Sequence, residues 1–163
     1  MSATSQFHAL ADRVVDELLA LDPVEATWLG DHRFDGLLPD RSASGVAGAL
    51  TTVDDAVTAL DAVDDIALDA DDQVDLEILR SGLLRWRFEL TDVRRHEWDP
   101  MVWNPGTGLY LLVARETRPV DERAEAARSR LAAVPDLLAT ARSVLGGMPH
   151  IHAETALAQF AGT

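Results

Sequence analysis

Apolar side chains recur at steps of three and four residues along almost all of this chain, and no stretch alternates in the way a strand does. That spacing places side chains on one face of an α-helix, which must then be buried against a neighbour. The pattern is clearest over 76–93 and returns over 7–19, 46–60 and 124–145. It predicts an all-α fold of about six helices in an antiparallel, partly irregular bundle without significant sheet, as a single domain over 1–163. The clearest stripe consists of Leu76, Leu79, Leu83, Trp86, Leu90 and Val93.

Proline and glycine residues mark where these helices should begin, end or bend. Pro23 follows Asp22, which can cap a helix start, and Gly30 can end the same short helix. Pro100 predicts the end of the long helix before it, and Pro135 should kink or split the last long helix. We therefore expect short loops between antiparallel neighbours.

The charge of the chain excludes two classes of partner. There are 28 acidic residues against 14 basic ones, a formal net charge of −14, and every basic residue is Arg. Such a field repels nucleic acid and anionic membrane surfaces, which bind through basic patches. The acidity indicates solubility or adaptation to salt, with an acidic site for a cationic ligand as the alternative. No apolar run approaches the roughly 20 residues of a membrane span and no signal peptide is visible, so we expect a cytoplasmic location.

Histidine and carboxylate spacing offers only weak metal-site candidates, and no catalytic residue is identified. "HEWDP" begins like a zinc-peptidase helix at His96, but Pro100 stands where the second His would be. "PHIHAET" brings His150, His152 and Glu154 close in sequence, yet alternate residues share a face only in an extended segment. The alternative is that Glu154 neutralises the start of a final helix.

The acidic run "DADDQVD" over 69–75 could suggest calcium binding. It lacks the glycine and the terminal glutamate of an EF-hand loop. Since acidic side chains are favourable in the first turn of a helix, we interpret the run as a solvated helix start.

One stretch, "LDPVEATWLGDHRFDGLLPDRSA" over 21–43, resembles the start of the bacterial domain of unknown function 885 family, whose members carry P-x-x-A-T-x-x-G-x-x-x-[YF]-D-x-x-L-P-D. Further similar segments follow in family order: "NPGTGLYLLVARE" from Asn104 and Pro105, "RLAAVPDLLATAR" over 130–142, and "MPHIHAETALAQFAG" over 148–162. The matching residues of the first stretch, of unknown role, are Pro23, Ala26, Thr27, Gly30, Phe34, Asp35, Leu38, Pro39 and Asp40.

The resemblance implies a relation to longer helical proteins that resemble carboxypeptidase-like zinc metallopeptidases. Their His-Glu-x-x-His helix lies beyond the matched region, and this sequence contains no copy of it. The chain would then be a non-catalytic N-terminal portion without a cofactor, cut before its packing partner, and a peptide substrate would exist only in a full-length protein. The alternative is a free-standing helical interaction module that self-associates or binds another chain. A small hydrolase using His150, His152 and Glu154 is the weakest hypothesis.

Overall fold

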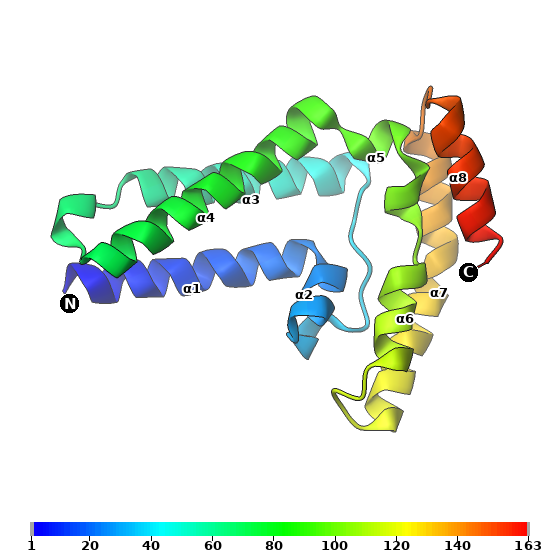
Figure 1. The fold of residues 1–163 in the computed structure, drawn as a ribbon, viewed down its shortest axis with the longest axis horizontal. Coiled ribbons are helices and arrows are strands. Elements are labelled where there is room, and N and C mark those ends of the chain that lie inside the picture. The colour runs from blue at the N-terminus through cyan, green and yellow to red at the C-terminus, as the bar shows by residue number, and fades with distance from the viewer. Residues whose placement is uncertain (1, 163) are drawn as a thin grey trace. The chain divides into compact units, whose positions relative to one another are not determined.

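A computed structural model describes residues 2–162 of the chain, which form helices joined by turns and loops (Figure 1). No strand occurs among these residues, so the predicted all-α fold is confirmed. The chain divides into two compact units. Unit 1 comprises Met1–Leu18 and Val46–Val93, and unit 2 comprises Leu19–Gly45 and Arg94–Thr163. The single domain over 1–163 stays a prediction.

Unit 1 is built from three long helices, each contributing one apolar face to a shared core. They are α1 (Ala3–Leu21), whose residues to Leu18 belong to this unit, α3 (Ala43–Asp61), which enters it at Val46, and α4 (Ala70–Phe88). The short 3-10 turn η2 (Asp65–Ala67) connects α3 to α4. The buried core side chains are Phe7, Val14, Val53, Ala56, Leu60, Leu68, Leu76 and Leu83. All except Leu68 lie in ranges where the three-and-four spacing predicts a buried helix face.

The long helix that Pro100 was predicted to end stops before that proline. α4 is α-helical only to Phe88 and continues as a π-helical segment, η3 (Glu89–Val93). Arg94 then adopts a left-handed backbone with φ of 52°, which breaks the helical hydrogen-bond ladder six residues before Pro100. Proline is therefore not what stops this helix.

Unit 2 contains the remaining helices. They are α2 (Pro23–Leu29), η1 (His32–Phe34), α5 (Arg95–Trp98), η4 (Pro100–Trp103), α6 (Gly106–Ala114), α7 (Val120–Val144) and α8 (His150–Phe160). α6 and α7 are joined by a short loop and lie side by side, as Figure 1 shows, and α6 also packs on α2. α8 packs against η4. The buried apolar side chains here include Ala26, Trp103, Leu111, Leu112, Ala141 and Ala156.

The local signals around α2 act as predicted. The Asp22 carboxylate accepts a hydrogen bond from the Glu25 backbone N–H at 3.1 Å, and Pro23 occupies the first helical position. Gly30 has φ of 94°, and its N–H closes the end of the helix. α7, by contrast, runs unbroken through Pro135, so the predicted split does not occur there.

Candidate functional site

The polar centre of unit 2 is a buried arginine of α7. Arg130 is 0% exposed and its guanidinium donates four hydrogen bonds. Its Nε donates to the Leu37 carbonyl at 2.9 Å, and its Nη1 donates to the Gly108 carbonyl at 2.6 Å. Its Nη2 donates to the Pro23 carbonyl at 3.0 Å and to Thr27 Oγ1 at 2.7 Å. One side chain thus joins α2, the loop after η1, α6 and α7.

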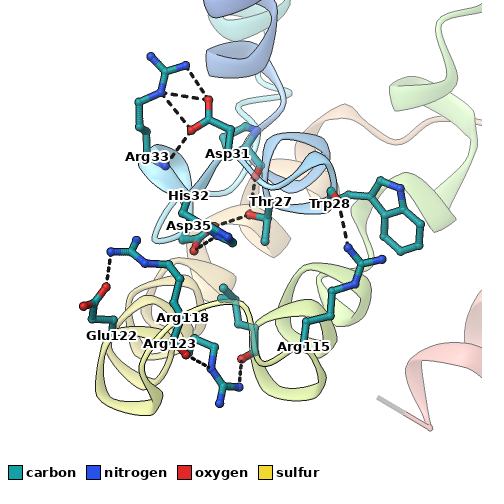
Figure 2. A network of polar contacts seen from close by, with 12 residues as sticks. Thr27, Trp28, Asp31, His32, Arg33, Asp35, Arg115, Arg118, Glu122 and Arg123 are labelled. Carbon is teal, nitrogen blue, oxygen red and sulfur yellow. Dashed lines mark hydrogen bonds and ion pairs between the residues drawn. The ribbon is translucent and has the colours of Figure 1, made fainter.

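Two further residues extend this contact through Thr27, which is itself buried. The Thr27 hydroxyl lies 2.8 Å from Asp35 Oδ1 and 2.9 Å from the Pro23 carbonyl, to either of which it can donate its proton. His32 donates from Nδ1 to the second oxygen of Asp35 at 2.9 Å, and Figure 2 shows His32, Asp35 and Thr27 converging in this way. We call Arg130, Thr27, Asp35 and His32 the Arg130 network.

The Arg130 network is organised for structure rather than for binding. Burial lowers the pKa of Arg130, and the negative charge of Asp35 opposes that effect, so the guanidinium remains a cation. All three of its guanidinium nitrogens donate hydrogen bonds to protein oxygens, and none of its surface faces solvent. A side chain in this state cannot reach a substrate, but it satisfies carbonyl groups that would otherwise be buried without a donor.

Glycine at position 108 is part of the same arrangement. A methyl group on Gly108 would lie 3.1 Å from Val24 Cγ2 and 3.3 Å from Arg130 Nη1, closer than ordinary van der Waals contact. The absence of a side chain lets α6 approach both α2 and the guanidinium closely. This explains one glycine of the "NPGTG" segment on packing grounds.

The other residues matched to the family also have structural roles. Asn104 accepts a hydrogen bond from the Gly106 backbone N–H at 2.8 Å, and Pro105 directly precedes α6, so the pair forms the start of that helix. The guanidinium carbon of Arg33 lies 5.3 Å from the centroid of the Phe34 ring. Pro39 lines two cavities, of about 130 Å³ and 320 Å³, on the segment that leads into α3.

The sequence gives no role to Arg130, which is only the first residue of the segment "RLAAVPDLLATAR". Thr27 and Asp35 were recognised as motif residues without a role. A buried arginine requires acceptors, but the residues near Arg130 in sequence do not show that it is buried.

The candidate metal residues near the C-terminal end do not come together. His150 begins α8, so the extended stretch that a site with His152 would require is absent. His150 Nδ1 instead lies 3.5 Å from Glu154 of the next turn, and both side chains are largely exposed. Within residues 2–162, no three His, Asp or Glu side chains are grouped so that they could hold a metal ion. His150, His152 and Glu154 therefore do not form a three-ligand site within the described residues.

His152 belongs to a second polar cluster, between α5 and α8. Its ring meets Trp98 edge-on with centroids 5.1 Å apart, and its Nδ1 lies 3.6 Å from Asp99 Oδ1. Asp99 is 2% exposed and accepts hydrogen bonds from the Arg95 side chain at 3.1 Å and from the Met101 N–H at 3.0 Å. Burial would raise the pKa of Asp99, but these hydrogen bonds and the charge of Arg95 outweigh it and lower that pKa. The cluster anchors α8 rather than offering a free group.

His96 contributes its backbone rather than its ring to the fold. Its carbonyl accepts a hydrogen bond from Trp103 Nε1 at 3.0 Å, and the ring is mostly covered. Burial lowers the pKa of His96, so the imidazole is held neutral more readily than a solvated one.

The acidic run over 69–75 is only partly solvated, which corrects the sequence-based interpretation. Asp69 caps α4 by accepting from the Asp71 and Asp72 N–H groups. Asp72, however, is 5% exposed. Its Oδ1 accepts a hydrogen bond from His8 Nε2 at 2.6 Å, while its buried Oδ2 has no hydrogen-bond partner within the described residues. Periodicity could not show this, because His8 lies 64 positions away.

The outside of unit 2 carries a cation–aromatic contact beside the Arg130 network. Figure 2 shows Arg115 over the ring of Trp28, with its guanidinium carbon 4.1 Å from the ring centroid. The same side chain donates to the Trp28 carbonyl at 3.0 Å, and Trp28 is 51% exposed. Arg123 donates to the carbonyls of Leu112 and Val113 and so closes the end of α6.

Comparisons with known proteins place the chain in a family. The model of bacterial proteins of unknown function DUF885 matches residues 23–163, and no curated protein matches. A solved structure described as a "putative lipoprotein of unknown function" from Shewanella oneidensis shares the fold with a TM-score of 0.90 at 24% identity. That match covers 96% of this chain and 29% of the Shewanella chain. Within residues 2–162 no helix is long and apolar enough to cross a membrane, and the cytoplasmic location stays a prediction.

Proposed function

We propose, from the fact that the chain belongs to the DUF885 family of bacterial proteins, that it is a non-catalytic N-terminal helical portion of a longer, zinc metallopeptidase-like protein. Membership confirms the resemblance of the opening stretch and its following segments. The length relation supports the proposal, because the chain spans about 29% of the Shewanella relative. The peptidase-like character itself rests on the resemblance.

The non-catalytic role is supported by the burial and internal hydrogen bonding of the residues that match the family motif. The polar groups of Thr27, Asp35 and Arg130 bind one another and backbone carbonyls inside unit 2. The matched motifs therefore serve to hold a helical scaffold together.

In this proposal the helical portion forms one wall of a substrate cleft. Zinc, the catalytic glutamate and the peptide substrate belong to the other part of the full-length protein, and this chain binds no cofactor by itself. The net charge of −14 argues against nucleic acid and anionic membranes as partners.

Metal content and peptidase activity of the purified 163-residue protein test the non-catalytic role. We expect less than about 0.1 zinc ion per chain after dialysis against excess zinc, and no cleavage of a mixed peptide library, because the ligand set is incomplete. Stoichiometric zinc that is lost in His150→Ala or His152→Ala would overturn the proposal in favour of the small hydrolase.

The mass of the natural product in its source cells tests the other half of the proposal. An immunoblot raised against this chain should detect a protein far heavier than 17.7 kDa. A single product of 17.7 kDa would contradict the proposal of a longer peptidase-like protein and favour the interaction module.

A second candidate function, the self-associating helical module, is favoured by one observation. α4 exposes Val74, Ile78, Leu84 and Phe88, each between 48% and 62% exposed, on a helix whose other side is already buried in the core.

A further inference from the structure

α4 is apolar on two opposite faces. Its inner face contributes Leu76 and Leu83, which are 2% and 0% exposed, to the core of unit 1. Its outer face carries Val74 (58% exposed), Ile78 (62%) and Phe88 (55%). Val74 and Phe88 are fourteen residues apart, two heptads, so they lie on almost the same line along the helix. An outer stripe of this kind is typical of a helix that packs against a second helix.

The composition of the outer face is symmetric about its middle residue. Ser81, which is exposed, lies halfway between Val74 and Phe88. Leu84 and Ile78 lie three positions on either side of it, and the charged residues Arg85 and Glu77 lie four positions on either side. The first half of the face thus carries the acid and the second half carries the base.

This arrangement is complementary to itself when one copy is reversed. We propose that the outer face of α4 binds the same face of a second copy of the chain, antiparallel, about a two-fold axis at Ser81. In that pairing Val74 of each copy is level with Phe88 of the other. The small side chain of Ser81 lets the two helices approach where they cross.

Charge complementarity identifies the second copy as the occupant of this face. Antiparallel pairing about Ser81 brings Glu77 of one copy to the level of Arg85 of the other, twice by symmetry. A parallel pairing in register would instead bring Glu77 to Glu77 and Arg85 to Arg85, which is unfavourable. Arg85 has no ion-pair partner within the part of its own chain that the structure describes. Glu77 lies 3.6 Å from Arg80 and accepts a hydrogen bond from the Ser81 hydroxyl at 3.2 Å, and 68% of its side chain is exposed.

The expected association is weak, because two opposing effects act on it. Burying four apolar side chains per copy favours the dimer, but one helix face is small compared with a stable interface of about 800 Å² per partner. Each copy also carries a net charge of −14, which repels its partner. We therefore expect a dimer that forms with rising concentration and is strengthened when salt screens the repulsion.

Charge reversal provides the first test, by analytical ultracentrifugation of the full chain at about 0.15 M salt. Glu77→Arg and Arg85→Glu should each weaken the dimer at least about tenfold, because each sets two like charges against each other. The double variant E77R/R85E should restore it. The matched control is E125R/R128E on α7, an exposed ion pair with three-residue spacing, which should leave the dimer unchanged.

A single cysteine provides the second test, because the natural sequence has none. Ser81→Cys should form a disulfide-linked dimer under mild oxidation, since the two-fold axis brings its Cα atoms within the roughly 7 Å that a disulfide requires. Thr58→Cys, exposed on α3, should remain monomeric under the same conditions.

Each possible result decides the question. A chain that stays monomeric at all concentrations overturns the proposal and leaves the outer face to another segment or partner. A dimer that is insensitive to E77R and R85E, or that links through Thr58→Cys as readily as through Ser81→Cys, overturns it as well. The proposal does not rest on the metallopeptidase-like role, so metal and peptidase assays of the same samples fail or succeed independently.

Discussion

Replacing Arg130 should destabilise unit 2 more than any other single change to a polar side chain there. Arg130→Met keeps the apolar stem but removes all four hydrogen bonds of the guanidinium. It leaves the buried Gly108 carbonyl and the carbonyl of half-exposed Leu37 without this donor, whereas the Pro23 carbonyl can still accept from the Thr27 hydroxyl. Each unsatisfied buried group costs about 1–3 kcal/mol, and partial relaxation makes the costs less than additive.

We therefore expect a loss of about 3 kcal/mol, because four hydrogen bonds from a charged donor are lost and part of that loss is recovered by Thr27 and by solvent at Leu37. That is a large fraction of the roughly 5–15 kcal/mol by which a domain is stable. Arg130→Lys retains the charge but presents a point cation instead of a fork, so it should satisfy only some of the acceptors and lie between wild type and Arg130→Met.

Urea unfolding followed by tryptophan fluorescence measures this effect, because Trp28, Trp98 and Trp103 all belong to unit 2. The matched control is Arg128→Met, two positions away on the same helix, where the side chain is 72% exposed and pairs with Glu125. That change should cost less than about 0.5 kcal/mol. An Arg130→Met protein within about 1 kcal/mol of wild type, a loss no larger than a single ordinary hydrogen bond, would refute the reasoning.

Three further expectations concern backbone positions and a histidine. Gly30→Ala should cost about 1–2 kcal/mol by thermal unfolding, because φ of 94° is unfavourable for any residue with a side chain; unchanged stability would contradict this. Gly82→Ala should stabilise the protein by up to about 1 kcal/mol through helix propensity, because the space around Gly82 is open. Gly108→Ala should destabilise it despite the same gain in propensity, because the added methyl group would crowd Val24 and Arg130. Equal shifts in melting temperature for the two variants would contradict the packing argument. The hydrogen bond to Asp72, followed by the charge of Asp72, raises the pKa of His8 above 6.5, so its stabilising contribution is fully present below pH 6.5 and is lost as pH rises through the raised value. Proton NMR titration should place His8 above 6.5, and the stability difference between wild type and His8→Gln should shrink across that window.

The parts of the fold that the sequence predicts are those decided by neighbouring residues. The cap of α2 is an example, since Asp22, Pro23 and Gly30 each act within one helical turn of their own position. The apolar faces of α1 and α4 were predicted for the same reason, because periodicity is a local property. The end of the helical run at Val93 was not, because the left-handed backbone follows at Arg94, a residue type that gives no such signal.

The Arg130 network could not be predicted because its contacts are distant in sequence. Arg130 is separated from its four acceptors by 22 to 107 positions. No periodic pattern reports such contacts, and a charged residue beside an apolar stripe is indistinguishable from a solvated one until the neighbouring helices are placed. Asp72 and His8, 64 positions apart, illustrate the same point in unit 1.

The C-terminal histidines show why spacing has meaning only once the local backbone is known. A two-residue interval between His150 and His152 would direct both rings to one side of an extended segment, but to different sides of a helix. Pro149 is extended, with φ of −59° and ψ of 138°, and α8 begins at the next residue. One histidine therefore turns toward Glu154 and the other toward Trp98 and Asp99. The helical backbone at His150 is therefore what separates the two interpretations.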